Sequence, residues 1–589
     1  MKKKSYVLGI SCYYHDSSAA LIRNGEIVAA AEEERFTRIK HDNSFPENAI
    51  KFCLKQQNIG IEDVSAIGFY EKPLIKLERI LYSHIDAFPL SLKKFVMAMP
   101  SWIHEKSRIV GIIQKKLKYR KNIHFIRHHT AHAASAFLVS PYKRAAILTI
   151  DGVGEWETTT IGIGKDSNIE LLKKIEFPHS IGLLYSTITA YLGFSVNNSE
   201  YKVMGLSAYG EKDKDKNQYY AKLKKIIDIK DDGSYFLDMS YFTYHFSDRM
   251  PSRKLCTLLD GKIRRRDEDI SIRHKDIAAA LQMITEEVIF KILRHLRKIS
   301  GEENLVISGG VGLNSVANGK ILKETGFKRI WIQPAASDSG TSIGAAAYVY
   351  NSILKKERHT MTSAYLGPEF SNEEINRFLE DNDIRYSGFK SREELLKKTA
   401  ELIYDNKVIG WFQGRMEFGP RALGSRSILA NPCNPKAKQL LNEKVKHRAR
   451  FRPFAPVVCV EDAEKFFDCD EPVPIPTDFM LMVYPIRKKW QKIIPSVTHV
   501  DGSGRLQTIR RKDNELYYDL IREFEGKSGI PILINTSFNI RGEPIVCTPE
   551  DAYRCMMGTG IDYLIIGKYL ISRKNNQKDI WNSEKDAND

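Results

Sequence analysis

The chain has 589 residues, of which 42% are hydrophobic and 28% charged, with a formal net charge of +17. This length exceeds what one hydrophobic core supports, so we expect two large domains, and the composition excludes a disordered or fibrous protein. The eight cysteines form no CxxC pair and no zinc-ribbon spacing, which favours reduced thiols and a cytoplasmic protein. The apolar run near the start is broken at His15 and Asp16, and no window suits a spanning helix, so neither export nor membrane contact is expected.

The positive charge suits phosphorylated substrates or nucleic acid. Lysine and arginine number 90 against 73 aspartates and glutamates. The sequence contains no helix-turn-helix, zinc-finger or aromatic RNP-like pattern, so nucleic acid is not an expected partner.

The first thirty residues predict three strands, in YVLGIS, AALIR and EIVAAA, with a hairpin turn at Asn24-Gly25. A similar phrase recurs at AAILTIDGVGEWETTTIGIG and is followed by a strand around IELLKKIEF. In each phrase a polar, tight turn follows the first strand, at residues 12–16 and 151–155. The repeat predicts an internal duplication whose halves face one another across a cleft, which is the plan of the actin-like ATPase fold.

Two later segments add turns of the kind that bind phosphate. NLVISGGVGLNSVANGKIL is an apolar strand that runs into a glycine-rich turn and a helix, where backbone N–H groups suit phosphate or ribose oxygens. RIWIQP predicts another strand, and PAASDSGTSIGAAAYVYNSIL places Asp338 on a turn before a helix of small residues.

A polar stretch, KKERHTMTSAYLGPEF, predicts a linker, so we expect domains at residues 1–355 and 356–589. The second domain reads as α/β, with helices in EELLKKTAELIYDN and KAKQLLNEKVKH and strands in KVIGWFQG, FAPVVCV and PILINTS. No GxxxxGK[ST] motif occurs, which excludes a P-loop enzyme.

The segment RHHTAHAASAF predicts a metal-binding face. His128 and His132 are four residues apart and share one face of a helix, beside His129. Asp151 and Asp338 are candidate oxygen ligands from turns that would line the same cleft. On spacing alone, metal binding and a structural histidine pair are about equally supported, and turn aspartates are common.

His15 and Asp16 occupy the first of the phosphate-type turns. A general base or an oxygen-orienting residue would sit there, close to the reacting group. A hydrogen-bonded turn pair would look the same, and the charge pattern does not separate the two.

The second domain carries arginines framed by glycine, proline and apolar residues, in QGRMEFGPRALGSRSILANP, EKVKHRARFRPFAP, GSGRLQTI and NTSFNIRGEP. Guanidinium groups set among rigid turns indicate a built anion site, because they bind phosphate in a bidentate manner. A basic surface loop or an RNA patch is the alternative. The basic residues concerned are Arg415, Arg421, Arg426, Lys446, Arg448, Arg452, Arg505 and Arg541.

Together these segments resemble the NodU/CmcH-type O-carbamoyltransferase family, whose members tailor antibiotics and nodulation factors. The matching phrases of the first domain are GISCYYHDSSAAL, EEERFTRIKHD, HHTAHAASAF, TIDGVGEW, EYKVMGLSAYG, ISGGVGLNS and SDSGTSIGAA. Those of the second are GRMEFGPRALGSRSILANP, FRPFAP and NTSFNIRGEPIV.

The resemblance implies a duplicated actin-like (ASKHA) first domain, like the partner in tRNA threonylcarbamoyladenosine synthesis, and a YrdC-like second domain that forms carbamoyl adenylate. It implies that His128, His132, Asp151 and Asp338 bind a divalent metal. Two imidazoles and two carboxylates suit Fe(II), Zn or Mn, of which we favour Fe(II).

The implied catalytic residues are His15, Asp16, Lys446, Arg448, Ser537 and Asn539, the last four as a KxR and SxN signature. The residues implied for nucleotide and carbamoyl phosphate binding are Gly152, Gly154, Lys202, Gly205, Gly309, Gly310, Asn314, Arg415, Arg421, Arg426, Arg452, Arg505, Asn535 and Arg541.

The implied reaction uses carbamoyl phosphate and ATP with Mg, forms carbamoyl adenylate in the second domain, and transfers the carbamoyl group in the first to a hydroxyl of a small molecule, as in antibiotic biosynthesis. His15 would assist deprotonation of that hydroxyl. The alternatives are a tRNA-modifying carbamoyl or threonylcarbamoyl transferase, an actin-fold ATPase or sugar kinase, and a metallopeptidase, which would lack the glutamate of an HExxH helix. The sequence does not specify the acceptor, and a homodimer is compatible with it.

Overall fold

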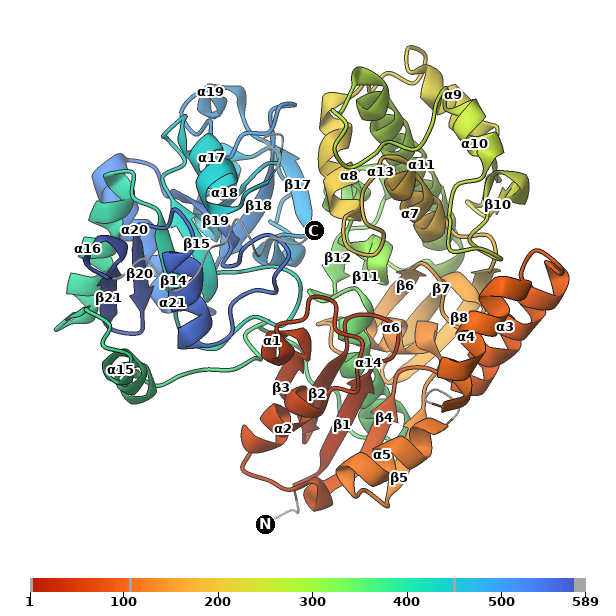
Figure 1. The fold of residues 1–589 in the computed structure, drawn as a ribbon, viewed down its shortest axis with the longest axis horizontal. Helices are drawn as coiled ribbons and strands as arrows, with labels where there is room; N and C mark the ends of the chain where they lie inside the picture. The colour runs from red at the N-terminus through yellow and green to blue at the C-terminus, as the bar shows by residue number, and fades with distance from the viewer. Residues whose placement is uncertain (1–3, 105–107, 449–451, 577–589) are drawn as a thin grey trace. The chain divides into compact units, whose positions relative to one another are not determined.

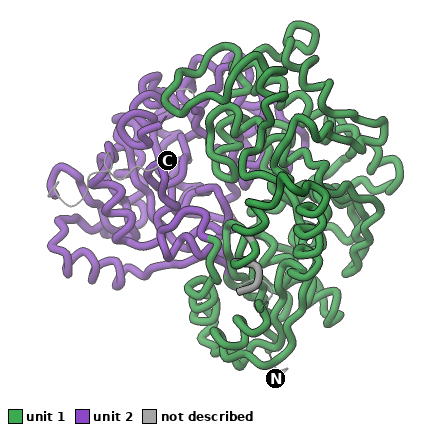
Figure 2. The backbone as a smooth tube through the Cα atoms, turned by 45° about the vertical axis from the view of Figure 1, so that its right-hand side comes forward, with its two compact units in different colours: residues 1–29, 43–361 green, residues 30–42, 362–589 purple. Residues whose placement is uncertain are grey.

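The computed structural model describes residues 4–104, 108–448 and 452–576. It divides into two compact units, coloured separately in Figure 2. Unit 1 comprises residues 1–29 and 43–361, and unit 2 comprises residues 30–42 and 362–589.

The first sheet of unit 1 has five strands in the order β3-β2-β1-β4-β5 (Figure 1). β1 pairs antiparallel with β2 and parallel with β4, and β4 pairs parallel with β5. Asn24 and Gly25 both have positive φ, at 50° and 97°, as a tight hairpin turn requires, so the predicted hairpin is confirmed. The strands are β1 Tyr6–Ser11, β2 Ser18–Arg23, β3 Glu26–Glu32, β4 Val64–Phe69 and β5 Asn122–Phe125.

The second sheet of unit 1 repeats this topology, in the order β8-β7-β6-β11-β12. Its first three strands form an antiparallel meander, and β11 pairs parallel with both β6 and β12. Because strand order and direction agree in both sheets, the predicted duplication of an actin-like α/β fold is confirmed. The strands are β6 Arg144–Ile150, β7 Glu157–Lys165, β8 Asn168–Glu176, β11 Asn304–Ser308 and β12 Arg329–Ile332.

Two helices, α6 (His128–Phe137) and α14 (Thr341–Ala347), bring the two sheets of unit 1 together (Figure 1). α14 packs on β1 and α6 packs on β11, and the two helices pack on each other. A Cβ at Gly344 would lie 1.9 Å from the carbonyl oxygen of Ala131, so this approach requires glycine.

The other elements of unit 1 are mostly helical. The helices are α2 Glu47–Lys55, α3 Pro73–Asp86, α4 Leu92–His104, α5 Ile109–Leu117, α7 Ile181–Tyr191, α8 Glu200–Leu206, α9 Gln218–Lys224, α10 Arg253–Leu258, α11 Ile272–Ser300, α12 Ser315–Asn318 and α13 Ile321–Thr325, and a small hairpin joins β9 Ile227–Ile229 to β10 Tyr235–Leu237.

Unit 2 contains one mixed sheet of nine strands, in the order β13-β21-β20-β14-β15-β19-β16-β18-β17. Its core includes Leu396, Trp411 and Phe524, where the amphipathic helices α16 and α20 pack beside the sheet. The unit is α/β as expected, and its likeness to YrdC-type domains remains a prediction. The strands are β13 Ser387–Gly388, β14 Ile409–Phe412, β15 Arg426–Ala430, β16 Ala455–Cys459, β17 Met482–Pro485, β18 Ser503–Ile509, β19 Ile532–Ser537, β20 Tyr563–Ile566 and β21 Tyr569–Ser572. The helices are α15 Asn372–Asp381, α16 Arg392–Tyr404, α17 Ala437–Leu440, α18 Ala463–Phe466, α19 Lys488–Gln491, α20 Glu515–Ser528 and α21 Pro549–Met557.

The division of the chain differs from the expected boundary at residue 355. Met361 still donates a backbone hydrogen bond to Val139, so unit 1 extends further along the predicted linker. Residues 30–42 belong to unit 2, although they begin within β3 of the first sheet. They include the short helix α1 (Glu34–Thr37).

The helix expected over KAKQLLNEKVKH is shorter than predicted. The α-helical part α17 ends at Leu440, a wider turn of π type spans Leu441–Val445, and His447 has a φ of 44°. The chain therefore leaves the helix at Lys446, whose side chain is buried.

All eight cysteines are free thiols, in line with the expectation from their spacing. Among the described residues, no helix combines the length and the apolar character that crossing a membrane requires.

Candidate metal centre and anion site

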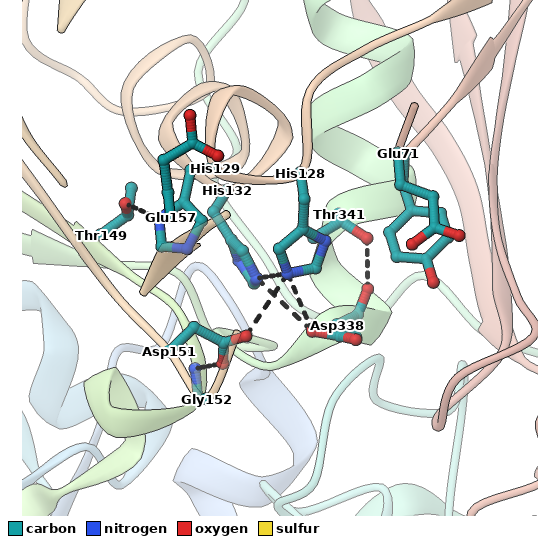
Figure 3. A network of polar contacts seen from close by, with 12 residues as sticks. Glu71, His128, His129, His132, Thr149, Asp151, Gly152, Glu157, Asp338 and Thr341 are labelled. Atoms are coloured by element: carbon teal, nitrogen blue, oxygen red, sulfur yellow. Dashed lines mark hydrogen bonds and ion pairs between the residues drawn. The ribbon is translucent and has the colours of Figure 1, made fainter. Parts of the chain in front are cut away.

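Four side chains of unit 1 form a buried cluster that has the composition of a metal site. His128 and His132 come from α6, Asp151 follows β6, and Asp338 lies in the turn before α14 (Figure 3). One ligand atom from each lies within 4.8 Å of the others. The two Nε2 atoms are 3.1 Å apart, His128 Nε2 lies 3.4 Å from Asp151 Oδ2, and His132 Nε2 lies 3.5 Å from Asp338 Oδ1.

The electrostatics of the cluster favour a cation among these groups. Burial disfavours the charged form of His128, but Asp338 and Asp151 outweigh it and raise the pKa of His128 to about 9. Burial opposes ionisation of Asp338, but His15, His128 and His132 lower the pKa of Asp338 overall. Both carboxylate oxygens of Asp338 are buried and accept no hydrogen bond from the described residues. Two imidazoles beside such a carboxylate therefore fit a divalent metal.

Two residues that the sequence did not single out hold the histidines in place. The Glu155 carboxylate accepts hydrogen bonds from the backbone N–H groups of His128, at 2.9 and 3.0 Å, and Lys72, at 2.8 Å, and so fixes the start of α6. Ser308 Oγ lies 3.1 Å from His132 Nδ1, which leaves Nε2 facing the cluster. Neither orienting role is recognisable from the sequence, because acidic residues in turns and serines at strand ends are common in proteins.

His129 lies outside the cluster despite its position next to His128. Its Nδ1 lies 2.6 Å from Thr149 Oγ1. Burial is the main reason why the pKa of His129 is lowered to about 3, and the neighbouring His128 and His132 add to the effect. The His129 ring therefore stays neutral.

His15 and Asp16 lie next to the cluster in the first tight turn. His15 Nδ1 is 3.0 Å from Asp16 Oδ2, and His15 Nε2 is 3.8 Å from Asp338 Oδ2. Burial opposes the charged form of His15, but Asp338 and the hydrogen bond to Asp16 raise its pKa to about 10. The two residues therefore form a hydrogen-bonded turn pair that adjoins the candidate metal ligands, and a general-base role for His15 stays a prediction.

Most of the glycines that were predicted for nucleotide binding near Asp151 pack closely around the metal-ligand cluster. Gly309 has a φ of 98°, and a Cβ there would lie 2.2 Å from the carbonyl oxygen of Ile150. Gly310 donates its N–H to Asp151 Oδ1 over 2.8 Å, and a Cβ at Gly154 would meet the His128 ring at 2.9 Å. Gly152 is open, since a Cβ there would meet only Leu183, at 3.9 Å.

Three other residues predicted to bind nucleotide lie on or beside helices of unit 1. Lys202 and Gly205 are on α8. Asn314 precedes α12 and caps it: its side chain accepts from the Ala317 N–H and exchanges hydrogen bonds with Gln282, so it is engaged within the fold.

In unit 2, Lys446 meets the SxN residues as the resemblance implies. Lys446 is 4% exposed, and its ammonium donates to the Ser537 carbonyl and to Asn539 Oδ1 at 2.8 Å. Burial holds the pKa of Lys446 well below its usual range, and the neighbouring cation Arg448 lowers it further. Arg448 Nε donates to Asn442 Oδ1 over 2.7 Å, and its guanidinium lies over the Phe454 ring.

The predicted arginine site divides into two groups. Arg421, Arg452 and Arg505 are half-buried, and Arg541 is exposed. Arg426, in contrast, is fully buried and donates to the carbonyls of Pro368, Gln413, Gly414 and Ser425.

Arg426 therefore has a structural role in place of the predicted anion binding. Arg415 likewise donates to the carbonyls of Leu366 and Gly367. Asn535 is buried, and its amide nitrogen donates to Ala422 and Gln507.

Residues 30–42 brace two loops of unit 2. Arg38 donates to the carbonyls of Pro544 and Ile545 at 2.9 and 2.7 Å, and its Nε lies 3.4 Å from Asp551. Glu32 accepts from the N–H of Gly419 at 2.8 Å, and Arg35 donates to the carbonyl of the same residue. The segment EEERFTRIKHD is one of the phrases that match the family. Nothing in its residues indicates that their partners lie so far along the chain.

Comparison with known proteins shows the family of the chain. The family model of the carbamoyltransferase N-terminus matches residues 6–347, and that of the carbamoyltransferase C-terminus matches residues 400–573. The chain belongs to the carbamoyltransferase family. This carbamoyltransferase is 43% identical to the uncharacterized protein sll1178 of Synechocystis, over 97% of each chain. It is 35% identical to the nodulation protein NolNO of Sinorhizobium fredii, over 97% of this chain and 80% of that protein.

Similar solved structures are remote. A full-length HypF in a phosphate- and nucleotide-bound form shares 13% identity and a TM-score of 0.31, over 61% of this chain and 57% of that chain. Component A of the 2-hydroxyglutaryl-CoA dehydratase of Acidaminococcus fermentans shares 14% identity and a TM-score of 0.30, over 59% of this chain and 99% of that chain.

Proposed function

We propose that this carbamoyltransferase uses ATP and carbamoyl phosphate to form carbamoyl adenylate in unit 2 and passes the carbamoyl group to a hydroxyl of a small molecule in unit 1. The observation that carries the proposal is the buried Lys446 ammonium, held by Ser537 and Asn539 beside Arg448, in a chain whose other unit holds a separate metal-type cluster. Two built sites of different chemistry suit a reaction in two steps.

In unit 2, the cations would bind the phosphate of carbamoyl phosphate. Water releases inorganic phosphate and leaves carbamate, whose oxygen attacks the α-phosphorus of ATP. Pyrophosphate departs, and carbamoyl adenylate forms. Arg448, and Lys446 once bound phosphate favours its ammonium form, would stabilise the negative charge that develops on the departing phosphate.

In unit 1, the acceptor hydroxyl oxygen attacks the carbamoyl carbon and AMP leaves. The carboxylate charges that raise the pKa of His15 would be offset by a metal bound to Asp338 and Asp151, and His15, oriented by Asp16, would then take the hydroxyl proton. A divalent metal held by His128, His132, Asp151 and Asp338, with Fe(II) favoured over Zn and Mn, would supply Lewis-acid polarisation of an oxygen of the carbamoyl adenylate.

The proposal is tested by incubating the purified chain with ATP and labelled carbamoyl phosphate and detecting carbamoyl adenylate by mass spectrometry. We expect carbamoyl-dependent pyrophosphate release. Arg448→Met should abolish adenylate formation, whereas His128→Ala should retain it and impair transfer. Absence of carbamoyl-dependent pyrophosphate would refute the activation step, and the reverse pattern in the two variants would refute the division of labour.

A further inference from the structure

Arg79 is a buried cation on α3 of unit 1 with no hydrogen-bond or ion-pair partner among the described residues. The residue is 7% exposed, and its guanidinium lies over the Phe177 ring, 4.9 Å from the centroid. Its Nε is buried without a hydrogen-bond partner, and among the described residues the guanidinium forms neither a hydrogen bond nor an ion pair. Burial of a cation is unfavourable unless acceptors replace the lost water, so an unpaired guanidinium here requires an explanation.

The acidic groups around Arg79 are already engaged. Glu71 forms an ion pair with Lys76, and the Glu155 carboxylate accepts the backbone N–H groups of Lys72 and His128. Burial lowers the pKa of Arg79, although the fields of Tyr14, Glu71 and Glu155 oppose that shift.

The helix that carries Arg79 contacts the turn next to the candidate metal ligands. Lys76, about one turn before Arg79 on α3, places its ammonium 4.8 Å from the centre of the Tyr14 ring. Tyr14 precedes His15, whose Nε2 lies 3.8 Å from Asp338 Oδ2. Glu155 connects the same region to the start of α6, because it binds the N–H of His128. A ligand at the metal cluster would therefore have the Arg79 guanidinium within its surroundings.

We infer that Arg79 forms an oxyanion-binding subsite beside the metal-ligand cluster of unit 1. A guanidinium presents paired N–H donors that match a carboxylate or a phosphate, and stacking on Phe177 fixes the plane of the fork. Two sources share this chemistry: the phosphate of the adenylate and an acidic group on the acceptor. Naming these two molecules rests on the proposed function, but oxyanion binding itself does not.

Calorimetric titration of the full chain with AMP, adenosine and inorganic phosphate separates the two sources. If the subsite takes the nucleotide phosphate, Arg79→Gln weakens AMP binding by about tenfold or more and leaves adenosine binding unchanged. If it takes an acidic group of the acceptor, AMP binding is unchanged, and the AMP-saturated wild type binds inorganic phosphate with an affinity that Arg79→Gln reduces by a similar factor. Equal affinities of wild type and Arg79→Gln for all three probes would overturn the inference.

Two further variants test whether weaker binding could arise from a disturbed fold and not from the loss of an oxyanion contact. Arg79→Lys keeps the charge and the aliphatic stem but loses the fork, so we expect a wild-type melting temperature with partly weakened oxyanion binding; unweakened binding would overturn the bidentate subsite. Arg294→Gln removes an arginine that is paired with Glu324 on the exposed side of α11, and should leave all three affinities unchanged. Carbamoyl-dependent pyrophosphate release by the wild type tests the proposed function separately, because it does not measure oxyanion binding at Arg79.

Discussion

The Nε2 atoms of His128 and His132 lie 3.1 Å apart, with the Asp338 carboxylate 3.6 and 3.5 Å from them. Two imidazole nitrogens face the same point, next to a carboxylate that accepts no hydrogen bond within the described part of the chain, and are therefore arranged to share one cation.

Substitution of the cluster should remove bound metal. We expect His132→Ala and Asp338→Asn to lose metal, measured by elemental mass spectrometry of the purified chain, because each removes one of the four ligands. His129→Gln is the matched control, since His129 bonds to Thr149 and points away from the cluster. Equal metal content in all of these variants would show that the cluster does not bind it.

Ser308→Ala should weaken metal binding without removing a ligand. Ser308 Oγ contacts His132 Nδ1 at 3.1 Å, and loss of such an orienting partner lowers metal affinity by about 10- to 100-fold. Competition with a chromophoric chelator measures the change. Ser337→Ala, in the turn before Asp338, provides a control whose affinity should match the wild type.

Phosphate binding in unit 2 should take up a proton through Lys446. Burial, together with Arg448, keeps the pKa of Lys446 well below its usual range in the free protein. A bound phosphate favours the ammonium and raises this pKa, so protons are absorbed at any pH between the free and bound values. The binding enthalpy should then depend on the ionisation enthalpy of the buffer.

The Lys446→Met variant should lose that buffer dependence, whereas Lys444→Met, at an exposed neighbouring position, should keep it. A wild-type enthalpy that is independent of the buffer would contradict the proposed role of Lys446.

Arg38→Ala should impair adenylate formation from a distance. Arg38 fixes the carbonyls of Pro544 and Ile545, and the adjoining loop holds Asn539 through its hydrogen bond to the Glu543 carbonyl at 2.8 Å. We expect the KM for carbamoyl phosphate to rise about tenfold in a pyrophosphate-release assay, the loss typical of a charged hydrogen bond. Arg38→Lys should recover little, because one ammonium does not reproduce both contacts.

The control for Arg38 is Arg23→Ala, which removes an arginine paired with Glu26 on the surface of unit 1. This variant should keep the wild-type KM. A tenfold rise in both variants would indicate general loss of stability in place of a positioned loop.

Features set by short stretches of sequence were predictable. The Asn24-Gly25 turn and the spacing of His128 and His132 determine local geometry directly, because the first needs positive φ and the second needs only one helical turn. The repeated meander likewise revealed the duplication of unit 1.

Features set by distant partners were not predictable. Arg426 sits among glycines as an anion-binding arginine would, yet its guanidinium faces four backbone carbonyls. Only the folded chain shows which acceptors surround it. The same holds for Glu155 and Ser308, whose roles depend on contacts with His128 and His132 from other elements.

The bracing of unit 2 by residues 30–42 also affects how the protein is made. Arg38 and its acceptor Ile545 are 507 residues apart in sequence. At roughly 5 to 20 residues per second, the ribosome needs about 25 to 100 s to supply the second partner after the first. The buried charges of this early segment must wait that long for the groups that satisfy them, so unit 2 is completed only after residue 545 has been synthesised.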